Sequence, residues 1–206
     1  MWEFVVQGGP IMVPLLISSV ISLAVILERY IFFRRTRNNN QKLFKKYSRY
    51  IRRNQFKEAI RDLKKERGPV ARVMAAGLTI IGGTGKNDLE EHLNLAGEQE
   101  VAKMEKNLMV LDVIASVSPL LGLLGTVLGI IDSFDILHLT GGVASPAQLS
   151  SGIARALLTT ATGLFIAIPT MVFYSHFIGI LNRRVRDLNR WTKEVQGLLE
   201  DVNTHV

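Results

Sequence analysis

The sequence has no cysteine, only 7% aromatic residues, and three long stretches with almost no charge. Without cysteine, the chain has no disulfide framework, no thiolate zinc site and no cysteine nucleophile. The four histidines are scattered and lack the spacing of metal ligands: His92, His138, His176 and His205. No nucleophile triad or pair of carboxylates is visible either. We therefore predict that the protein is not an enzyme and holds no metal and no cofactor.

The apolar residues are concentrated in three blocks, although 21% of the chain is charged. The first block, 10–27, and the third, 156–181, carry no charge, and the second, 108–131, contains only Asp112. About 20 apolar residues are enough to cross a bilayer core. We therefore predict an all-α integral membrane protein with three transmembrane helices. Their expected bounds are 10–33, 108–131 and 152–181.

Lysine and arginine are distributed very unevenly along the chain and predict its orientation. Of the 25 basic residues, 18 lie within 34–106 and five within 183–193, whereas 1–9 and 132–151 contain none. Cytoplasmic flanks of membrane helices are enriched in Lys and Arg. We expect 1–9 and the loop 132–151 outside, and the helical loop 34–107 and the C-terminal helix 182–206 inside. Because the start lacks the basic region of a cleaved signal peptide, the first span is interpreted as an uncleaved anchor.

The basic loop has a second possible interpretation. Its aromatic residues, together with the net charge of +7 of the whole chain, are also typical of a nucleic-acid-binding protein. A topological role near anionic lipid explains the same charges, so we predict no nucleic-acid partner. Within the loop, 41–65 and 70–81 have helical periodicity and are separated by Gly68-Pro69. The run 82–86 superficially resembles a phosphate-binding loop but lacks the Ser or Thr after its lysine, which favours a turn.

Two of the three spans are expected to extend into a cytoplasmic helical bundle. Asn87-Asp88 can cap a helix that continues through Val101 and Met104 into the second span. After the third span, apolar residues recur every three, four or seven positions through 185–202, which indicates a helix continuing out of the membrane.

Small residues define a packing face on both later spans. At 100° per residue, a set of small residues of the second span falls within roughly 60° on one face. The third span has a similar face, and such faces allow close approach of a second helix. The predicted packing residues are Ser118, Gly122, Gly125, Gly129 and Gly163, with Ala156, Thr160 and Ala167 beside the last of them.

A polar face lies next to each packing face. On the second span it contains Asp112, Ser116, Pro119 and Thr126, and on the third it contains Arg155, Thr159 and Thr162. A single threonine commonly bonds to a carbonyl of its own helix. Four threonines on two small-residue helices favour a polar seam or pore instead: Thr126, Thr159, Thr160 and Thr162. A proton path usually needs a titrating carboxylate, and neither span centre has one. If protons cross here, the acid belongs to a partner's helix.

Two runs resemble the signatures of a known family. The run 118–127, SPLLGLLGTV, is similar to the second-span signature of the TolQ/ExbB/MotA proton-channel family. The runs 152–161, GIARALLTTA, and 163–169, GLFIAIP, are similar to its third-span signature. The opening also matches the ExbB/TolQ branch, through 8–10, 14–16 and Glu28-Arg29. The resemblance covers nearly the whole chain in order, and MotA-type stators, which usually have four spans, fit less well.

The resemblance implies a homopentamer around a central pore in the bacterial inner membrane, with a periplasmic N-terminus and a cytoplasmic C-terminus. It also implies a dimer of a single-span ExbD/TolR-type partner whose helix brings an Asp into the pore. Proton flow then performs work on the cell envelope through an energy-transducing protein. The family's pore threonines map onto Thr126 and Thr160. Many relatives have Glu where this chain has Arg155, which makes Arg155 a candidate gating residue.

Two other functions stay open on the sequence alone. A flagellar or gliding-type stator would couple ion flow to a rotor through the charged loop. A non-conducting oligomeric scaffold would need the packing glycines but not the threonine hydroxyls. The sequence does not distinguish H⁺ from Na⁺, nor does it identify the envelope process.

Overall fold

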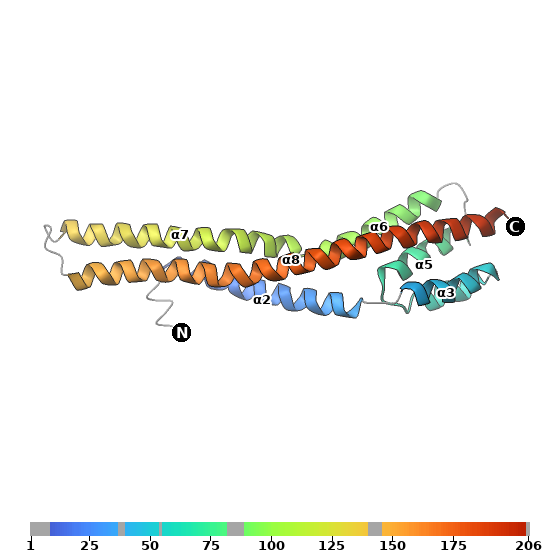
Figure 1. Ribbon diagram of the computed structural model, residues 1–206, viewed down its shortest axis with the longest axis horizontal. Coiled ribbons are helices and arrows are strands. Elements are labelled where there is room, and N and C mark those ends of the chain that lie inside the picture. Colours follow the sequence, from blue (N-terminus) through green and yellow to red (C-terminus); the bar gives the residue numbers. More distant parts are fainter. Residues whose placement is uncertain (1–8, 37–39, 54, 82–88, 140–145, 205–206) are drawn as a thin grey trace. The chain divides into compact units, whose positions relative to one another are not determined.

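The computed structural model describes residues 9–36, 40–53, 55–81, 89–139 and 146–204, and this part of the chain is helical with no strand. In chain order the helices are α2 Met12–Arg35, α3 Asn40–Arg52, α4 Phe56–Leu63, α5 Pro69–Ile81, α6 Leu89–Glu105, α7 Leu108–Leu139 and α8 Pro146–Thr204 (Figure 1). Pro69 occupies the first position of α5, where a helix does not need its missing N–H.

Within the described residues, three helical segments are long and apolar enough to cross a membrane: Met12–Arg35, Leu89–Leu139 and Ser150–Leu199. They confirm the predicted all-α, three-span membrane class. The second of these segments combines α6 and α7, and the third belongs to α8, which runs for 59 residues. The apolar span of α8 continues into further helix, and that of α7 is preceded by α6, as expected for two spans extended into a bundle.

The helix expected to continue into the second span is interrupted at one point. α6 ends at Glu105, α7 begins at Leu108, and Asn107 between them has a φ of 63°. Asparagine adopts this left-handed conformation at low cost and commonly ends helices in it. The side-chain amide of Asn107 also donates a hydrogen bond to Glu28 Oε2 at 3.3 Å. The helix is therefore interrupted where a neighbouring acceptor holds the asparagine.

Two other segments differ from the sequence expectation, and two more lie outside the described residues. The segment 132–151, expected as an external loop, is helical over 132–139 and 146–151, and its placement outside the membrane stays a prediction. The single helix expected over 41–65 is instead the pair α3 and α4, while the helix expected over 70–81 is confirmed as α5. The predicted turn 82–86 and the cap at 87–88 lie outside the described residues.

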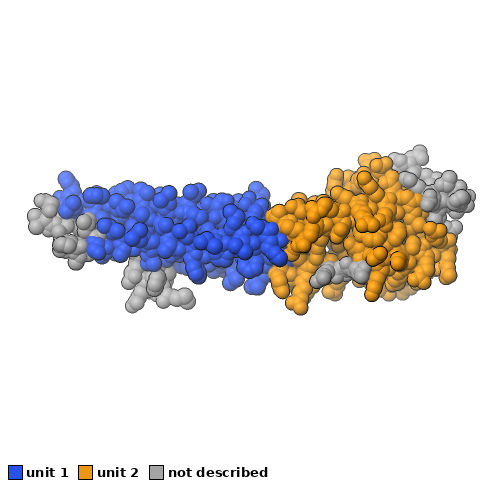
Figure 2. All heavy atoms as spheres, in the orientation of Figure 1, with its two compact units in different colours: residues 1–29, 107–177 blue, residues 30–106, 178–206 orange. Residues whose placement is uncertain are grey.

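The chain divides into two compact units, coloured separately in Figure 2. Unit 1 comprises 1–29 and 107–177, and unit 2 comprises 30–106 and 178–206. In unit 1, Met12, Leu15, Ile114 and Ile166 form a buried cluster. Many other apolar side chains of this unit are exposed, Phe165 at 81% among them. Exposed apolar surface of this extent is suited to lipid or to another protein chain.

Unit 2 has a core that draws on α3, α4, α5, α6 and the later part of α8. Its fully buried side chains include Tyr47, Leu63, Met74, Leu93 and Leu199. α3 and α4 are joined by a polar contact, in which Asp62 Oδ2 accepts hydrogen bonds from Lys46 Nζ at 2.7 Å and from the Tyr47 hydroxyl at 3.1 Å. This contact joins α3 to α4.

The contact between α3 and α4 should be sensitive to acid. The hydrogen bond from Lys46, and then that from Tyr47, lowers the pKa of Asp62 below its ordinary value of 3.8. A carboxyl group with a lowered pKa stabilises the fold above its unfolded pKa, and that stabilisation is lost as the pH falls through the folded value. We expect Asp62→Asn to lower the thermal midpoint slightly at neutral pH and not at all in strong acid. An unchanged difference between variant and wild type below pH 3.8 would contradict the assignment.

Candidate functional site

The small residues of α7 lie against α8 within one chain, in unit 1 (Figure 1). A Cβ atom on Gly122 would lie 3.0 Å from both Thr159 O and Thr160 Cα. A Cβ atom on Gly163 would lie 2.5 Å from Ser118 O and 3.1 Å from Gly122 Cα. Backbone therefore meets backbone at this crossing, which is the geometry that small-residue faces allow.

Gly129 and Gly125 continue the same contact. A Cβ atom on Gly129 would lie 2.8 Å from the Cβ of Ala156, and one on Gly125 would lie 2.7 Å from the Cβ of Thr159 and closer still to its hydroxyl. Thr159 is only 1% exposed. Its hydroxyl donates to Ala156 O at 2.7 Å and lies 3.2 Å from Gly122 O. Thr159 thus fills the space left by Gly125, and the expectation that it lines a pore does not match its burial inside the chain.

Thr126 and Thr160 form a hydroxyl pair between the two helices. Their Oγ1 atoms hydrogen-bond to each other, and either one can be the donor. Thr160 Oγ1 also lies 3.0 Å from Gly122 O, and Thr126 Oγ1 lies 3.1 Å from Ala156 O. Both side chains are half-buried. Each hydroxyl has one proton and two lone pairs, so the protons of this pair can be redistributed among several acceptors.

The carbonyl oxygen of Gly122 is common to this network. It lies within hydrogen-bond distance of the hydroxyls of Thr126, Thr159 and Thr160, at 3.3, 3.2 and 3.0 Å. Glycine at 122 lets α8 approach closely enough for hydroxyls of the second helix to reach this oxygen. The packing face and the polar face were predicted separately. In the structure, the close packing at Gly122 brings the threonine hydroxyls of α8 within hydrogen-bond distance of its carbonyl oxygen.

Thr162 and Arg155 lie apart from that network. The Thr162 hydroxyl donates to Leu158 O of its own helix at 2.8 Å, and Arg155 is exposed. At 100° per residue, Thr162 falls about 20° from Arg155, whereas Thr160 falls about 140° away. The four predicted threonines therefore do not share one surface. For Thr162, the simple alternative of a bond within its own helix describes the structure.

Ser118 is completely buried in the same contact, and its hydroxyl has no hydrogen-bond partner among the described residues. A buried polar group without a partner costs about 1–3 kcal/mol relative to a satisfied one. Serine at position 118 contributes its small size to this interface, because Gly163 of α8 packs directly against the backbone oxygen of Ser118.

An arginine that no sequence pattern distinguishes joins two helices of unit 2. The Arg184 guanidinium donates to Thr36 Oγ1 and to Phe33 O, at 2.5 Å each, and lies over the Phe33 ring. The last carbonyls of a helix have no partner within it, so an arginine from a neighbouring helix is well suited to satisfy one of them. In the sequence, Arg184 is one of five basic residues within 183–193, and no local pattern sets it apart from the others.

The site contains no group of its own that titrates at its centre. No acidic residue occurs in 113–131 or 156–181. The described residues contain no cluster of histidine or acidic side chains able to hold a metal ion. Chemically, the α7–α8 contact can accept and donate hydrogen bonds through its threonines, but it cannot store a proton as a carboxylate can.

The sequence model of the MotA/TolQ/ExbB proton channel family matches residues 65–190, which include α7 and the threonine-bearing part of α8. The chain belongs to this family. The biopolymer transport protein ExbB-like 3 of Synechocystis sp. is 31% identical over 191 residues, which cover 92% of this chain and 90% of that protein. This MotA/TolQ/ExbB member is therefore a membrane protein of a proton-channel family, not of a family of enzymes.

Shorter matches relate the same chain to proteins named TolQ and to proteins named ExbB. The Tol-Pal system protein TolQ of Haemophilus influenzae is 37% identical over 108 residues, which cover 52% of this chain and 46% of that protein. The biopolymer transport protein exbB1 of Vibrio cholerae is 42% identical over 74 residues, which cover 36% of this chain and 32% of that protein. The resemblance to the ExbB/TolQ branch is thus confirmed at the level of family.

Proposed function

We propose that this MotA/TolQ/ExbB member is a stator-like proton-channel subunit of the bacterial inner membrane. Together with a single-span ExbD/TolR-type partner, it converts proton motive force into mechanical work on the cell envelope. The process served is outer-membrane transport or envelope integrity, because the relatives' names refer to biopolymer transport and to the Tol-Pal system. The proposal rests on family membership and on the chemistry of the α7–α8 contact.

The observation that carries the proposal is the hydroxyl pair of Thr126 and Thr160 in a contact without carboxylates. Hydroxyls that share acceptors can pass a proton along, but a titrating acid has to load and release it. An Asp on a partner's transmembrane helix supplies that acid in our proposal. Each proton that crosses 100 mV releases about 2.3 kcal/mol, so a few protons are enough to drive a conformational change.

The assembly we propose is a homo-oligomer, with a pentamer implied by the family resemblance, around a dimer of the partner. The exposed apolar side chains of unit 1, Leu123 and Phe165 among them, supply surface for lipid and for neighbouring subunits. The half-buried threonine pair is partly accessible from the single chain, as a pore-lining group has to be. Arg155 is exposed on the same helix, and we retain it as a candidate gating residue rather than a proton relay.

The orientation we propose has the N-terminus in the periplasm and the C-terminus and basic loop in the cytoplasm. Lys45→Cys should not react with an impermeant thiol reagent added outside intact cells, because 34–106 contains 18 basic residues. Leu139→Cys is the matched control, since Leu139 is 83% exposed at the end of α7 and should react. The absence of native cysteine makes both results easy to interpret. Labelling at position 45 from outside would refute this orientation.

The function is tested by proton flux through the purified complex in liposomes. We expect flux under an imposed membrane potential, and its loss when the partner's intramembrane Asp is replaced by Asn. Envelope transport or integrity in cells should fail with the same replacement. If the envelope function survives that replacement, the non-conducting scaffold is the better assignment. A defect confined to swimming or gliding would favour a motility stator, and flux under a sodium gradient alone would change the ion.

A further inference from the structure

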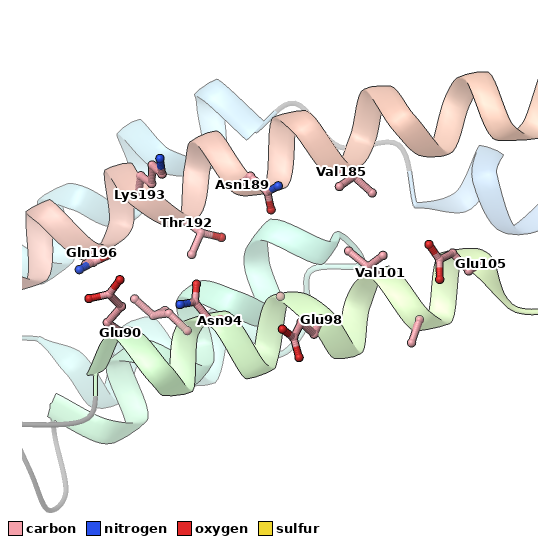
Figure 3. Close-up of a pocket in the computed structure, with 13 residues that line it drawn as sticks. Glu90, Asn94, Glu98, Val101, Glu105, Val185, Asn189, Thr192, Lys193 and Gln196 are labelled. Carbon is pink, nitrogen blue, oxygen red and sulfur yellow. The ribbon is translucent and has the colours of Figure 1, made fainter.

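Unit 2 contains a groove of about 640 Å³ between α6 and the later part of α8. In Figure 3 the two helices run alongside each other, with Asn94 and Val101 of α6 and Asn189 and Thr192 of α8 directed toward the space between them. Gly97 also lines this groove, and a Cβ atom placed on it would meet nothing within 4 Å. Side-chain volume is therefore missing from the α6 wall.

The charged residues of the groove are mainly acidic. Glu90, Glu98 and Glu105 line it, all three are exposed, and none makes an ion pair among the described residues, whereas Lys193 is the one cation in the lining. Glu100 of the same helix behaves differently, because it is buried and paired with Arg72 and Lys103. Three exposed carboxylates beside an open groove favour a basic occupant.

The same unit also presents a basic helix, α3. The segment 40–53, which includes α3, has no acidic residue. Leu43, Tyr47 and Ile51 are buried, so α3 faces its own chain with its apolar side. On the exposed side, Lys42, Lys45 and Arg49 fall within about 60° of one another at 100° per residue, and the exposed Arg53 follows the end of the helix.

The charges on the two helices also have similar spacing. Lys42 and Arg49 of α3 are seven residues apart, as are Glu98 and Glu105 of α6, and seven residues of helix span about 10 Å. Within unit 2, α3 contacts α4, α4 contacts α5, and α5 contacts α6. The same basic helix also packs against α8, where the ring centroids of Phe44 and Trp191 lie 5.1 Å apart, so its apolar side is occupied within the chain and its basic side is left exposed. Two different, complementary patches on one subunit can repeat head to tail and close into a ring.

We propose that the groove between α6 and α8 receives the basic face of α3 from a second copy of this chain. The inference rests on the proposed homo-oligomer and names the contact that would join its subunits in unit 2. A competing role for the α3 face is to bind anionic lipid, but lipid leaves the acidic groove unexplained. A neighbouring α3 accounts for both surfaces at once.

The first test blocks the groove without disturbing the fold. Gly97→Trp places a large side chain in open space, so the purified chain should keep its helix content and thermal midpoint but lose ring-sized species in mild detergent. Gly197→Trp is the matched control, because a Cβ atom on Gly197 also meets nothing within 4 Å and this residue does not line the groove. Ring-sized species of unchanged abundance in Gly97→Trp would overturn the inference.

The second test asks whether the two surfaces meet. Arg49→Cys and Glu98→Cys, carried on separate co-expressed chains, should form a disulfide between copies under mild oxidation, and Lys57→Cys with Glu98→Cys should not. Reversing the charge of Glu98 and Glu105, or of Lys45 and Arg49, should each reduce ring-sized species. Mixing the two reversed chains should restore them.

The outcomes separate this inference from the proposed function. Wild-type rings without the cross-link overturn the α3–groove contact and leave the proposed homo-oligomer intact. A wild-type chain that stays monomeric under every mild condition overturns both. Cross-linking of Glu98→Cys to the single-span partner, or loss of binding to anionic vesicles with unchanged rings in the α3 reversal, assigns the surfaces to other occupants and overturns the inference.

Discussion

Gly163→Ala is expected to destabilise the contact between α7 and α8 by about 2 kcal/mol or more, a large effect for the addition of one methyl group. The new Cβ would lie 2.5 Å from Ser118 O and 3.1 Å from Gly122 Cα. Both atoms belong to the backbone, so no side-chain rotation relieves the overlap. The helices have to separate, and separation moves the Gly122 carbonyl away from the threonine hydroxyls that now reach it. The measurement is the thermal midpoint and the oligomeric mass of the purified variant in detergent.

Other positions on the same helices supply matched controls. Gly179→Ala, also on α8, should leave the midpoint unchanged or raise it, because a Cβ there meets nothing within 4 Å and alanine favours helix. Ser118→Ala removes a buried hydroxyl that has no partner among the described residues and should not destabilise either. Gly125→Leu should disrupt the contact as Gly163→Ala does, because it meets Thr159. Native midpoint and native mass in Gly163→Ala would show that α7 and α8 do not pack in this way.

The second large effect is a loss of proton flux in the double variant Thr126→Val, Thr160→Val. Valine keeps the branched shape of threonine and removes the hydroxyl, so packing is largely retained while the pair that joins the two helices disappears. We expect a complex that assembles and binds its partner but conducts at least about 100-fold less, the lower range for removing a positioned proton-transfer group. The measurement is flux in liposomes together with envelope function in cells.

Thr162→Val is the matched control for the double variant. Its hydroxyl bonds to Leu158 O of its own helix, and it lies away from the pair on α8. Flux should therefore stay near the wild-type level. Full flux and full envelope function in an assembled Thr126→Val, Thr160→Val complex would contradict the proposed role of the pair. Equal losses in the control and the double variant would point to packing rather than to the hydroxyls.

Several features of the fold follow from local composition and were predictable from the sequence. The three spans are visible because about 20 consecutive apolar residues have no other common explanation when they recur three times. The small-residue faces were predictable because the angular step of a helix is fixed, so 118, 122, 125 and 129 fall on one side whatever surrounds them. The family signature lies in these same two segments, and the match of the family to 65–190 confirms it.

The roles of individual threonines were not predictable in the same way. Thr159 and Thr160 are adjacent and chemically identical, yet Thr159 is buried opposite Gly125 whereas Thr160 pairs with Thr126. A hydroxyl can bond to its own helix or to a neighbouring one. The choice depends on whether a foreign oxygen lies within about 3 Å, which is the range of a hydrogen bond. The sequence does not contain that distance.

The sequence alone determined the class of this protein: a helical membrane protein with two small-residue, threonine-bearing spans of the MotA/TolQ/ExbB family. The tertiary structure decided which hydroxyls meet at the Gly122 carbonyl, that Arg184 satisfies Phe33 O, that Asn107 interrupts the helix before α7, and that a groove with acidic residues opens beside α6. Membrane insertion and helix periodicity depend on neighbours along the chain. Hydrogen bonds between helices, and the grooves that lie between helices, depend on how distant segments of the chain pack. This packing is fixed only when the chain has folded.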